Sequence, residues 1–284
     1  MADTLNSNHN EPVISTDSQE VPAQRTEPVE AAADAETTEI AVGAAQRPGT
    51  DSTAPEDSEL KSLCADGYGI QRRGLEVSAT VTDGAGHAED TVRYATTVPF
   101  SITQMGMVMG GVTALTHAGR MAEAFDKPPH VSCVYANTEP GRPWSIHWIG
   151  DCRAYGWDGQ ALTQRTTDQT MGEWLRWNGG KTIQIVPTDD AESQDNWARL
   201  GLRQATDLTT RQVEIPEEIR LVLLCSDGIS DQVDKDTAEE LCRTHFADPQ
   251  ALADALVAAA EDGEEDGRPY RDDATAVVLL RRTG

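Results

Sequence analysis

A short stretch near residue 225 joins an apolar strand to a carboxylate. Residues 221–225 are an unbroken apolar run with the length and composition of a buried strand. Asp227 and Gly228 follow after one serine, so an acidic side chain stands where the chain leaves the core. Glycine there lets the backbone turn or come close to a ligand. A carboxylate in this place is a natural ligand for a hard divalent cation, although a strand followed by an ordinary Asp-Gly turn has the same pattern.

The same combination of an apolar run and an acidic residue occurs at three other places. Each run has the length of a strand, and each carboxylate stands at one end of it. A metal cluster explains four such positions in one domain better than four unrelated turns do. The positions are Asp83 with Gly84 after residues 75–82, Asp151 after residues 145–149, Asp227 after residues 221–225, and Asp272 with Asp273 before residues 274–280.

These carboxylates, together with Asp66, converge if the strand ends lie at one edge of the fold. Without a cation they would repel one another and raise one another's pKa values. Bound Mg²⁺ or Mn²⁺ removes that penalty, whereas the all-oxygen ligand set argues against Zn²⁺. Two such ions about 3.5–4 Å apart can hold a hydroxide and a phosphoryl oxygen for in-line displacement.

Composition excludes several classes of function. The chain has 284 residues, with 48 acidic and 23 basic side chains and a formal charge of −25. Such a surface disfavours nucleic acid and anionic membranes, both of which need basic patches. No apolar window is long enough for a membrane span, and the first residues do not resemble a signal peptide. We therefore expect a cytoplasmic protein that binds neither nucleic acid nor membrane; the sequence does not indicate an oligomeric state.

The five cysteines are odd in number and form no Cys-x-x-Cys pair. We expect reduced thiols in or near the core, as is usual in the cytosol. A catalytic cysteine would need a histidine partner, and the six histidines show no pattern that provides one.

The first 58 residues form a separate compositional block. They contain twelve acidic and two basic residues and no Phe, Trp or Tyr. Such a segment buries too little apolar surface to offset the entropy of ordering. We expect a disordered acidic tail over residues 1–58, which either extends the chain for solubility or docks on the domain, and a folded domain over residues 59–284.

Apolar patterning favours an α+β domain over alternating βαβ units. The order is strands, helices, a strand meander, an irregular insert, a strand, two helices and a final strand. A β-sandwich covered by helices fits this order. The segments are strands at 75–82, 130–137, 144–150, 153–157, 161–165, 220–225 and 274–280, and helices within 89–125 and at 171–177, 237–245 and 249–261.

The sequence also predicts helix breaks, a strand meander and the burial of one tryptophan. Pro99 and Gly110 are the expected breaks in the helical region. Residues 130–165 are expected to form one antiparallel meander. Trp197 is expected to be buried, in a helical turn at 196–202.

Five segments in this order resemble the PPM (protein phosphatase 2C) family of metal-dependent Ser/Thr protein phosphatases. The resemblance covers roughly residues 60–281 and looks closest to a divergent, actinobacterial-like bacterial subset. Each segment is weak alone, and their common order and spacing make the match specific. The segments are VTDGAGH at 81–87, WIGDCRAY at 148–155, LTQRTTDQT at 162–170, CSDG at 225–228 and DDAT at 272–275.

The resemblance implies a central antiparallel β-sandwich flanked by helices, in α/β/β/α layers, with a two-metal centre in a cleft at one end. Carried over by position, it implies that Asp83 bridges two Mn²⁺ or Mg²⁺ ions and that the Gly84 carbonyl binds one. It also implies that Asp227 and Asp272 are ligands of the paired metals. Asp151 would belong to the more variable region where a third ion binds in the family.

The residues that handle phosphate depart from the family pattern. Asp66 falls at the acidic end of the family's R-x-x-N/E-E/Q-D motif, which implies that it orients water at the metals. Lys61 stands where the family has its phosphate-binding arginine, and lysine lacks the bidentate guanidinium fork. Cys64 and Ala65 replace the polar pair before Asp66, and Gln169 replaces a histidine.

The resemblance implies hydrolysis of phosphoserine and phosphothreonine in proteins by a hydroxide held between two ions. Its alternative is a phosphatase-like binding or regulatory module with weak or no activity, since the ligand carboxylates are kept while the phosphate-handling residues differ. Other metal hydrolases, including a small-molecule phosphatase, fit the same carboxylates. A further departure from the family pattern is Asp273, which stands where the family commonly has asparagine after its last metal ligand.

Lys61→Arg is expected to raise the turnover of an aryl phosphate if Lys61 binds the phosphoryl group. The reason is that a guanidinium donates two parallel hydrogen bonds to phosphate oxygens, whereas an ammonium acts as a point charge. Steady-state kinetics of the two proteins measure the difference. Equal turnover in an active protein would remove Lys61 from the phosphate site.

Overall fold

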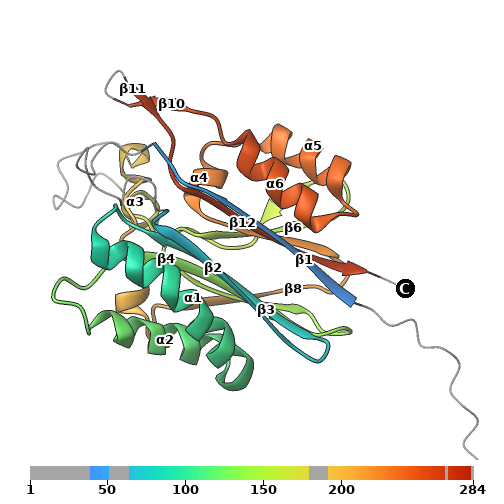
Figure 1. The fold of residues 1–284 in the computed structure, drawn as a ribbon, viewed down its shortest axis with the longest axis horizontal. Coiled ribbons are helices and arrows are strands. Elements are labelled where there is room, and N and C mark those ends of the chain that lie inside the picture. Colours follow the sequence, from blue (N-terminus) through green and yellow to red (C-terminus); the bar gives the residue numbers. More distant parts are fainter. Residues whose placement is uncertain (1–38, 51–63, 179–190, 266–267, 283–284) are drawn as a thin grey trace, which may run out of the picture. The chain divides into compact units, whose positions relative to one another are not determined.

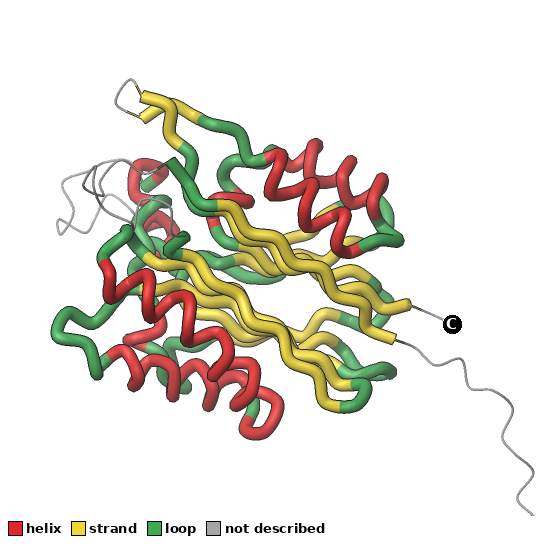
Figure 2. The backbone as a smooth tube through the Cα atoms, in the orientation of Figure 1, coloured by secondary structure: helices red, strands yellow, loops and turns green. Residues whose placement is uncertain are grey.

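Two antiparallel sheets pack face to face and carry helices on their outer faces (Figures 1 and 2). The computed structural model describes residues 39–50, 64–178, 191–265 and 268–282. One five-stranded sheet has the order β1 (Glu39–Arg47), β12 (Ala274–Arg282), β9 (Leu221–Cys225), β6 (Arg153–Trp157), β7 (Leu162–Gln164). The other has the order β2 (Asp66–Arg73), β3 (Glu76–Gly84), β4 (Val131–Thr138), β5 (Trp144–Ile149), β8 (Arg211–Ile215).

The helices form the two outer layers. Helices α1 (Glu89–Met109) and α2 (Gly111–Ala122) lie on the β2–β8 sheet, and α5 (Lys235–His245) and α6 (Pro249–Ala259) lie on the β1–β7 sheet (Figure 1). The remaining described elements are short: α3 (Met171–Trp177), α4 (Asp227–Ser230), the 3₁₀ turns Glu192–Gln194 and Leu202–Gln204, and the hairpin of β10 (Gly263–Glu265) and β11 (Arg268–Tyr270). The predicted α/β/β/α sandwich is confirmed.

Apolar side chains fill the space between each pair of layers. The central strands are buried on both faces, which explains their unbroken apolar runs. Alternate residues of β9 show this: Val222 and Leu224 point into the sandwich, whereas Leu223 and Cys225 face α5 and α6. All five cysteines are free and buried, as expected. No helix in the described part of the chain is long and apolar enough to cross a membrane.

Strand β1 lies inside the segment predicted to be a disordered tail, so the boundary at residue 59 is wrong. Residues 39–47 pair along their whole length with β12, and Ile40 is 1% exposed in the sandwich core. The residues that face α6, Ala41, Gly43 and Ala45, are small because that helix packs directly on the strand. A Cβ atom on Gly43 would lie 2.2 Å from the backbone of Pro249. A tightly packed strand therefore has the composition that predicted a tail. The rest of the predicted tail, residues 1–38 and 51–58, lies outside the described residues.

The predicted meander at 130–165 is also wrong, because its strands divide between the two sheets. β4 pairs with β5 in one sheet, and β6 pairs with β7 in the other. The chain changes sheets at residues 150–152. Strand β8, which sequence patterning missed, pairs with the free edge of β5.

Helix α1 continues through Pro99, where a break was predicted, and ends at Gly110 as expected. Proline has no N–H group, so it leaves the carbonyl oxygen of Ala95 without its helical donor. The Thr82 hydroxyl of β3 donates to that oxygen at 2.8 Å. The neighbouring strand thus removes most of the penalty of a proline inside the helix.

Ile40→Ala is expected to lower the free energy of unfolding by about 2–4 kcal/mol, because it leaves a cavity between the sheets. Glu39→Ala, at the exposed neighbouring position, is the matched control and should change it by less than about 0.5 kcal/mol. Chemical denaturation measures both. Equal stability of the two variants would show that β1 does not belong to the core.

Candidate active site

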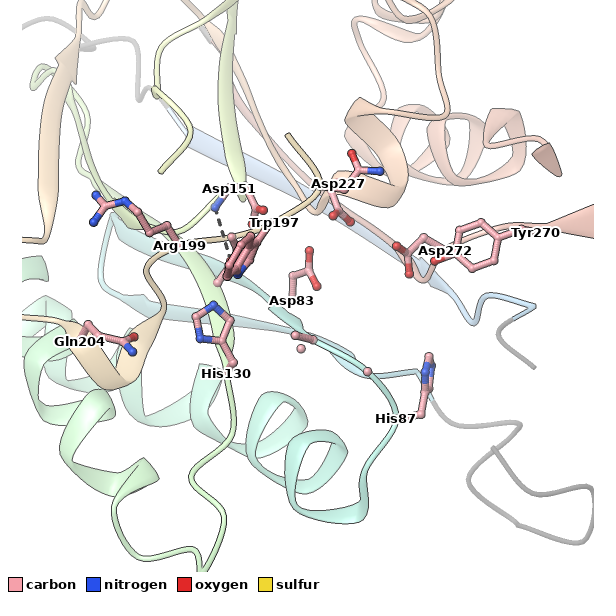
Figure 3. Close-up of a pocket in the computed structure, with 16 residues that line it drawn as sticks. Asp83, His87, His130, Asp151, Trp197, Arg199, Gln204, Asp227, Tyr270 and Asp272 are labelled. Carbon is pink, nitrogen blue, oxygen red and sulfur yellow. Dashed lines mark hydrogen bonds between the residues drawn. The ribbon is translucent and has the colours of Figure 1, made fainter. Parts of the chain in front are cut away.

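A pocket of about 710 Å³ lies at one end of the sandwich and is lined by four of the predicted carboxylates. Asp83 is the next-to-last residue of β3 and Asp151 follows β5, so both come from the β2–β8 sheet. Asp227 begins α4 directly after β9, and Asp272 precedes β12, so both come from the other sheet. Figure 3 shows the carboxylates of Asp83, Asp227 and Asp272 facing a common space. The structure therefore brings together side chains that are up to 189 positions apart in sequence (Asp83 and Asp272).

Asp66 lies behind this group. It pairs directly with Asp83 in the ladder between β2 and β3, and it is 1% exposed. Its Oδ2 atom is buried without a hydrogen-bond partner among the described residues. Gly84 lines the pocket and donates its N–H to Ala65 at 3.1 Å. Lys61 lies outside the described residues.

Two glycines let the backbone bring these carboxylates together. A Cβ atom on Gly228 would lie 2.0 Å from the carbonyl oxygen of Asp273, so the segments before β12 and after β9 meet backbone to backbone. Gly150 has a φ of +92°, and a Cβ atom there would lie 2.1 Å from the Ser132 hydroxyl. The turn at Gly150 is where the chain changes sheets, and it delivers Asp151 to the pocket.

Crowding of the carboxylates favours their protonated forms. Burial raises the pKa of Asp83 well above its ordinary value, and the charges of Asp66 and Asp151 raise it further. Burial likewise raises the pKa of Asp227 far above normal, with Asp83 as the next cause. The pKa values of Asp66, Asp151 and Asp272 are raised chiefly by burial as well.

This donor set fits a hard divalent cation. The acidic side chains that line the pocket are all aspartates, and a bound cation would relieve the repulsion among their carboxylates. The buried Oδ2 of Asp66 has no hydrogen-bond partner among the described residues and can likewise be satisfied when a cation and its water enter. Among the described residues, no three His, Cys, Asp or Glu side chains are drawn together closely enough to form a finished metal site. The carboxylates thus surround a common space and would have to close on an ion.

Asp273 holds three segments around the pocket without lining it. Its carboxylate is 3% exposed and accepts the backbone N–H groups of Gly49 and Ala65, each at 2.6 Å. His87 Nε2 lies 3.0 Å from Oδ2. One N–H reaches each oxygen, so both oxygens must accept. Aspartate satisfies this, whereas the amide of an asparagine would place a donor against a donor, which explains the departure at this position.

Sequence patterning missed several residues of the pocket. Trp197 is 54% exposed and lines the pocket, so the prediction that it is buried is wrong. No motif or spacing in the sequence marks these residues as lining a pocket. They include His130, Trp197, Arg199, Gln204 and Tyr270.

Comparison with known proteins agrees with the geometry. A family model described as stage II sporulation protein E (SpoIIE) matches residues 177–282. No curated protein matches the sequence. Among solved structures, the serine/threonine phosphatase Stp1 of Staphylococcus aureus is 16% identical, with a TM-score of 0.63 over 90% of this chain and 100% of its own.

Two mycobacterial structures are similar to the same extent. The serine/threonine phosphatase PstP/Ppp of Mycobacterium tuberculosis is 19% identical, with a TM-score of 0.59 over 85% of this chain and 98% of its own. The PPM Ser-Thr phosphatase MsPP of Mycobacterium smegmatis, in complex with cacodylate, is 20% identical, with a TM-score of 0.58 over 85% of this chain and 97% of its own. This chain has the PPM phosphatase fold. The resemblance seen in five short segments is confirmed at the level of the fold.

The PPM fold of this chain is expected to gain more stability from Mn²⁺ at pH 8 than at pH 5. A carboxyl whose pKa is raised by folding stabilises the folded state at low pH and loses that contribution as pH rises through its folded pKa. At pH 8 the cation-free cluster is therefore at its least stable, and Mn²⁺ replaces the missing protons.

A hundredfold excess of Mn²⁺ over its dissociation constant should raise Tm by about 5–10 °C at pH 8. Differential scanning calorimetry with and without EDTA measures the shift. Asp83→Asn should reduce it, and Asp236→Asn, at an exposed position on α5, should not. An equal shift at both pH values would contradict the cluster's role in binding the cation.

Proposed function

We propose that this protein is a metal-dependent phosphatase that hydrolyses phosphoserine and phosphothreonine in proteins. The observation that carries the proposal is the convergence of four carboxylates, from four separate strand ends and both sheets, on one pocket. The PPM fold supports it, because solved structures similar to this chain are described as Ser/Thr phosphatases. The proposed partners are phosphorylated proteins of the cytoplasm.

The proposal gives each acidic residue a role. Asp83, Asp227, Asp272 and the carbonyl of Gly84 would hold two Mn²⁺ or Mg²⁺ ions, and Asp151 would contribute to a third. The ions, when bound, supply Lewis acidity that activates water and offsets the negative charge of the phosphoryl group.

Other side chains of the pocket would orient the water molecule and bind the phosphoryl group. The unpartnered Oδ2 of Asp66 accepts a hydrogen bond from a water molecule and orients it. His130 adds a donor at the pocket wall for the phosphoryl group or the leaving oxygen. The proposed contribution of Lys61 rests on its position in sequence.

Asp227→Asn is expected to lower kcat/KM for p-nitrophenyl phosphate by more than about a hundredfold, because even residues that only support a metal ligand contribute 10–100-fold. Assays with Mn²⁺, with Mg²⁺ and with EDTA measure this. The matched control is Asp236→Asn, which removes a carboxylate from the exposed first turn of α5. Turnover that persists in EDTA, or in Asp227→Asn, would contradict the proposal.

A phosphatase-like binding module is the alternative. The departures at Lys61 and Ala65 favour it. Titration calorimetry with Mn²⁺ separates the two functions: metal binding with no turnover of aryl phosphate or phosphopeptide identifies the binding module, whereas turnover that depends on bound metal identifies the enzyme.

A further inference from the structure

A second cavity of about 650 Å³ adjoins the carboxylate pocket, and its walls are unusually apolar for so acidic a chain. Two of its residues are among the most exposed large side chains described: Trp177 is 76% exposed and Leu208 is 81% exposed. Trp148, by contrast, is 6% exposed and donates its indole N–H to the carbonyl of Thr167 at 2.8 Å. We name this cavity the tryptophan groove and define it by Trp148, Trp174, Trp177, Leu200 and Leu208.

The tryptophan groove lies beside the candidate active site. Arg199 lines both cavities, and in Figure 3 its guanidinium extends away from the carboxylates. A ligand that reaches both sites therefore has to cross no more than the length of this side chain, a distance that a few peptide residues span.

Gln169 connects the walls of the two cavities. Its side-chain oxygen accepts the N–H of Gly150 at 2.9 Å, next to Asp151, and its amide nitrogen donates to the carbonyl of Thr209 at 2.8 Å, beside Leu208. Its backbone carbonyl accepts the N–H of Arg199 at 3.0 Å. The groove is thus held at a fixed position relative to the carboxylate pocket.

The charges in the groove favour an acidic ligand. Its acidic residues are already paired: Asp168 with Arg153 at 2.7 Å, and Glu173 with Arg176 at 3.2 Å. Arg199 and Arg211 line the groove and form no ion pair with any residue that the structure describes; Arg199 Nε is buried without a partner there. The chain has a formal charge of −25, yet this cavity combines the exposed Trp177 with two arginines that have no ion-pair partner among the described residues. This combination favours a ligand that is both apolar and acidic.

We propose that the tryptophan groove binds the polypeptide next to the phosphorylated residue of the substrate, with a large apolar side chain against Trp177 and Leu208 and an acidic side chain near Arg211. The inference rests on the proposed function, because the phosphoryl group of the same polypeptide occupies the carboxylate pocket. It narrows the substrates to phosphoproteins whose phosphosite is flanked by an aromatic or aliphatic residue and by acidic residues.

The first test is kinetic. The probes are synthetic phosphothreonine peptides in which a single tryptophan is moved through successive positions on either side of the phosphothreonine, and p-nitrophenyl phosphate is the small substrate. The wild-type protein should prefer one tryptophan position by about tenfold, as expected for burying one large apolar side chain. In Trp177→Ala/Leu208→Ser the ratio of kcat/KM for that peptide to kcat/KM for p-nitrophenyl phosphate should fall by about the same factor.

Phe100→Ala is the matched control, since Phe100 is 63% exposed on α1, away from both cavities, and its loss should leave the ratio unchanged. No preference for any tryptophan position would overturn the proposal. So would a double variant whose ratio matches that of Phe100→Ala. A large loss of unfolding free energy in the double variant would show instead that these side chains pack against the protein's own chain.

A second test addresses charge. Arg211→Glu should lower kcat/KM for peptides with flanking glutamates by about tenfold relative to peptides with flanking lysines, because the cation becomes an anion. Arg120→Glu, at an exposed position of α2, is the control and should leave this ratio unchanged. An equal ratio in the two variants would contradict recognition of acidic flanks.

Binding separates failure of this proposal from failure of the proposed function. If the wild-type protein turns over neither substrate class, the phosphatase proposal fails, and fluorescence anisotropy of the labelled peptides still examines the groove. Binding that depends on tryptophan position and is lost in Trp177→Ala/Leu208→Ser supports the groove as a phosphopeptide site of a binding module. Binding that is equal in both proteins overturns the groove proposal.

Discussion

Repulsion among buried and partly buried carboxylates is the constraint around which this fold is arranged. Asp66, Asp83, Asp151, Asp227 and Asp272 stand at or behind one pocket, and burial raises the pKa of each. A chain that crowds carboxylates in this way must fix them by other means, because they do not attract one another. Each is therefore placed where a strand begins or ends, so that the hydrogen-bonded sheets and their apolar core position it.

The division of the strands between two sheets follows from the same need. A continuous meander would deliver Asp151 to an edge of one sheet, whereas the change of sheet at Gly150 brings it between both. Gly228 allows the backbone after β9 to touch the backbone before β12, which brings Asp227 and Asp272 together. Asp273 then holds the strand β1 segment, the start of β2 and His87 to the same point. The apolar core supplies stability, and these few close approaches supply the geometry.

Periodicity and local chemistry indicated a helix-covered β-sandwich and marked the carboxylates, and the resemblance to the PPM family implied the α/β/β/α layers. Apolar runs such as residues 221–225 predicted the doubly covered strands, and the acidic residues at their ends predicted the pocket. Predictions from local sequence failed where tertiary contacts decide the structure. β1 has the composition of a tail because its face toward α6 has room only for small residues, and α1 continues through Pro99 because Thr82 donates to the carbonyl oxygen that proline leaves without a donor. Arg199 could not have been predicted as a pocket residue, because no motif or spacing marks it and its role depends on which cavities it lines.

Gln169 shows how a departure from a family pattern can be read physically. A neutral amide offers an acceptor and a donor at once, and here the acceptor holds Gly150 while the donor holds Thr209. The pattern's usual histidine could make both bonds only as one specific neutral tautomer, because a protonated ring has no acceptor. Glutamine keeps the link between the carboxylate pocket and the tryptophan groove independent of pH. The substitution that looked like a loss of phosphate-handling chemistry is therefore better understood as a fixed structural connection between the pocket and the surface beside it.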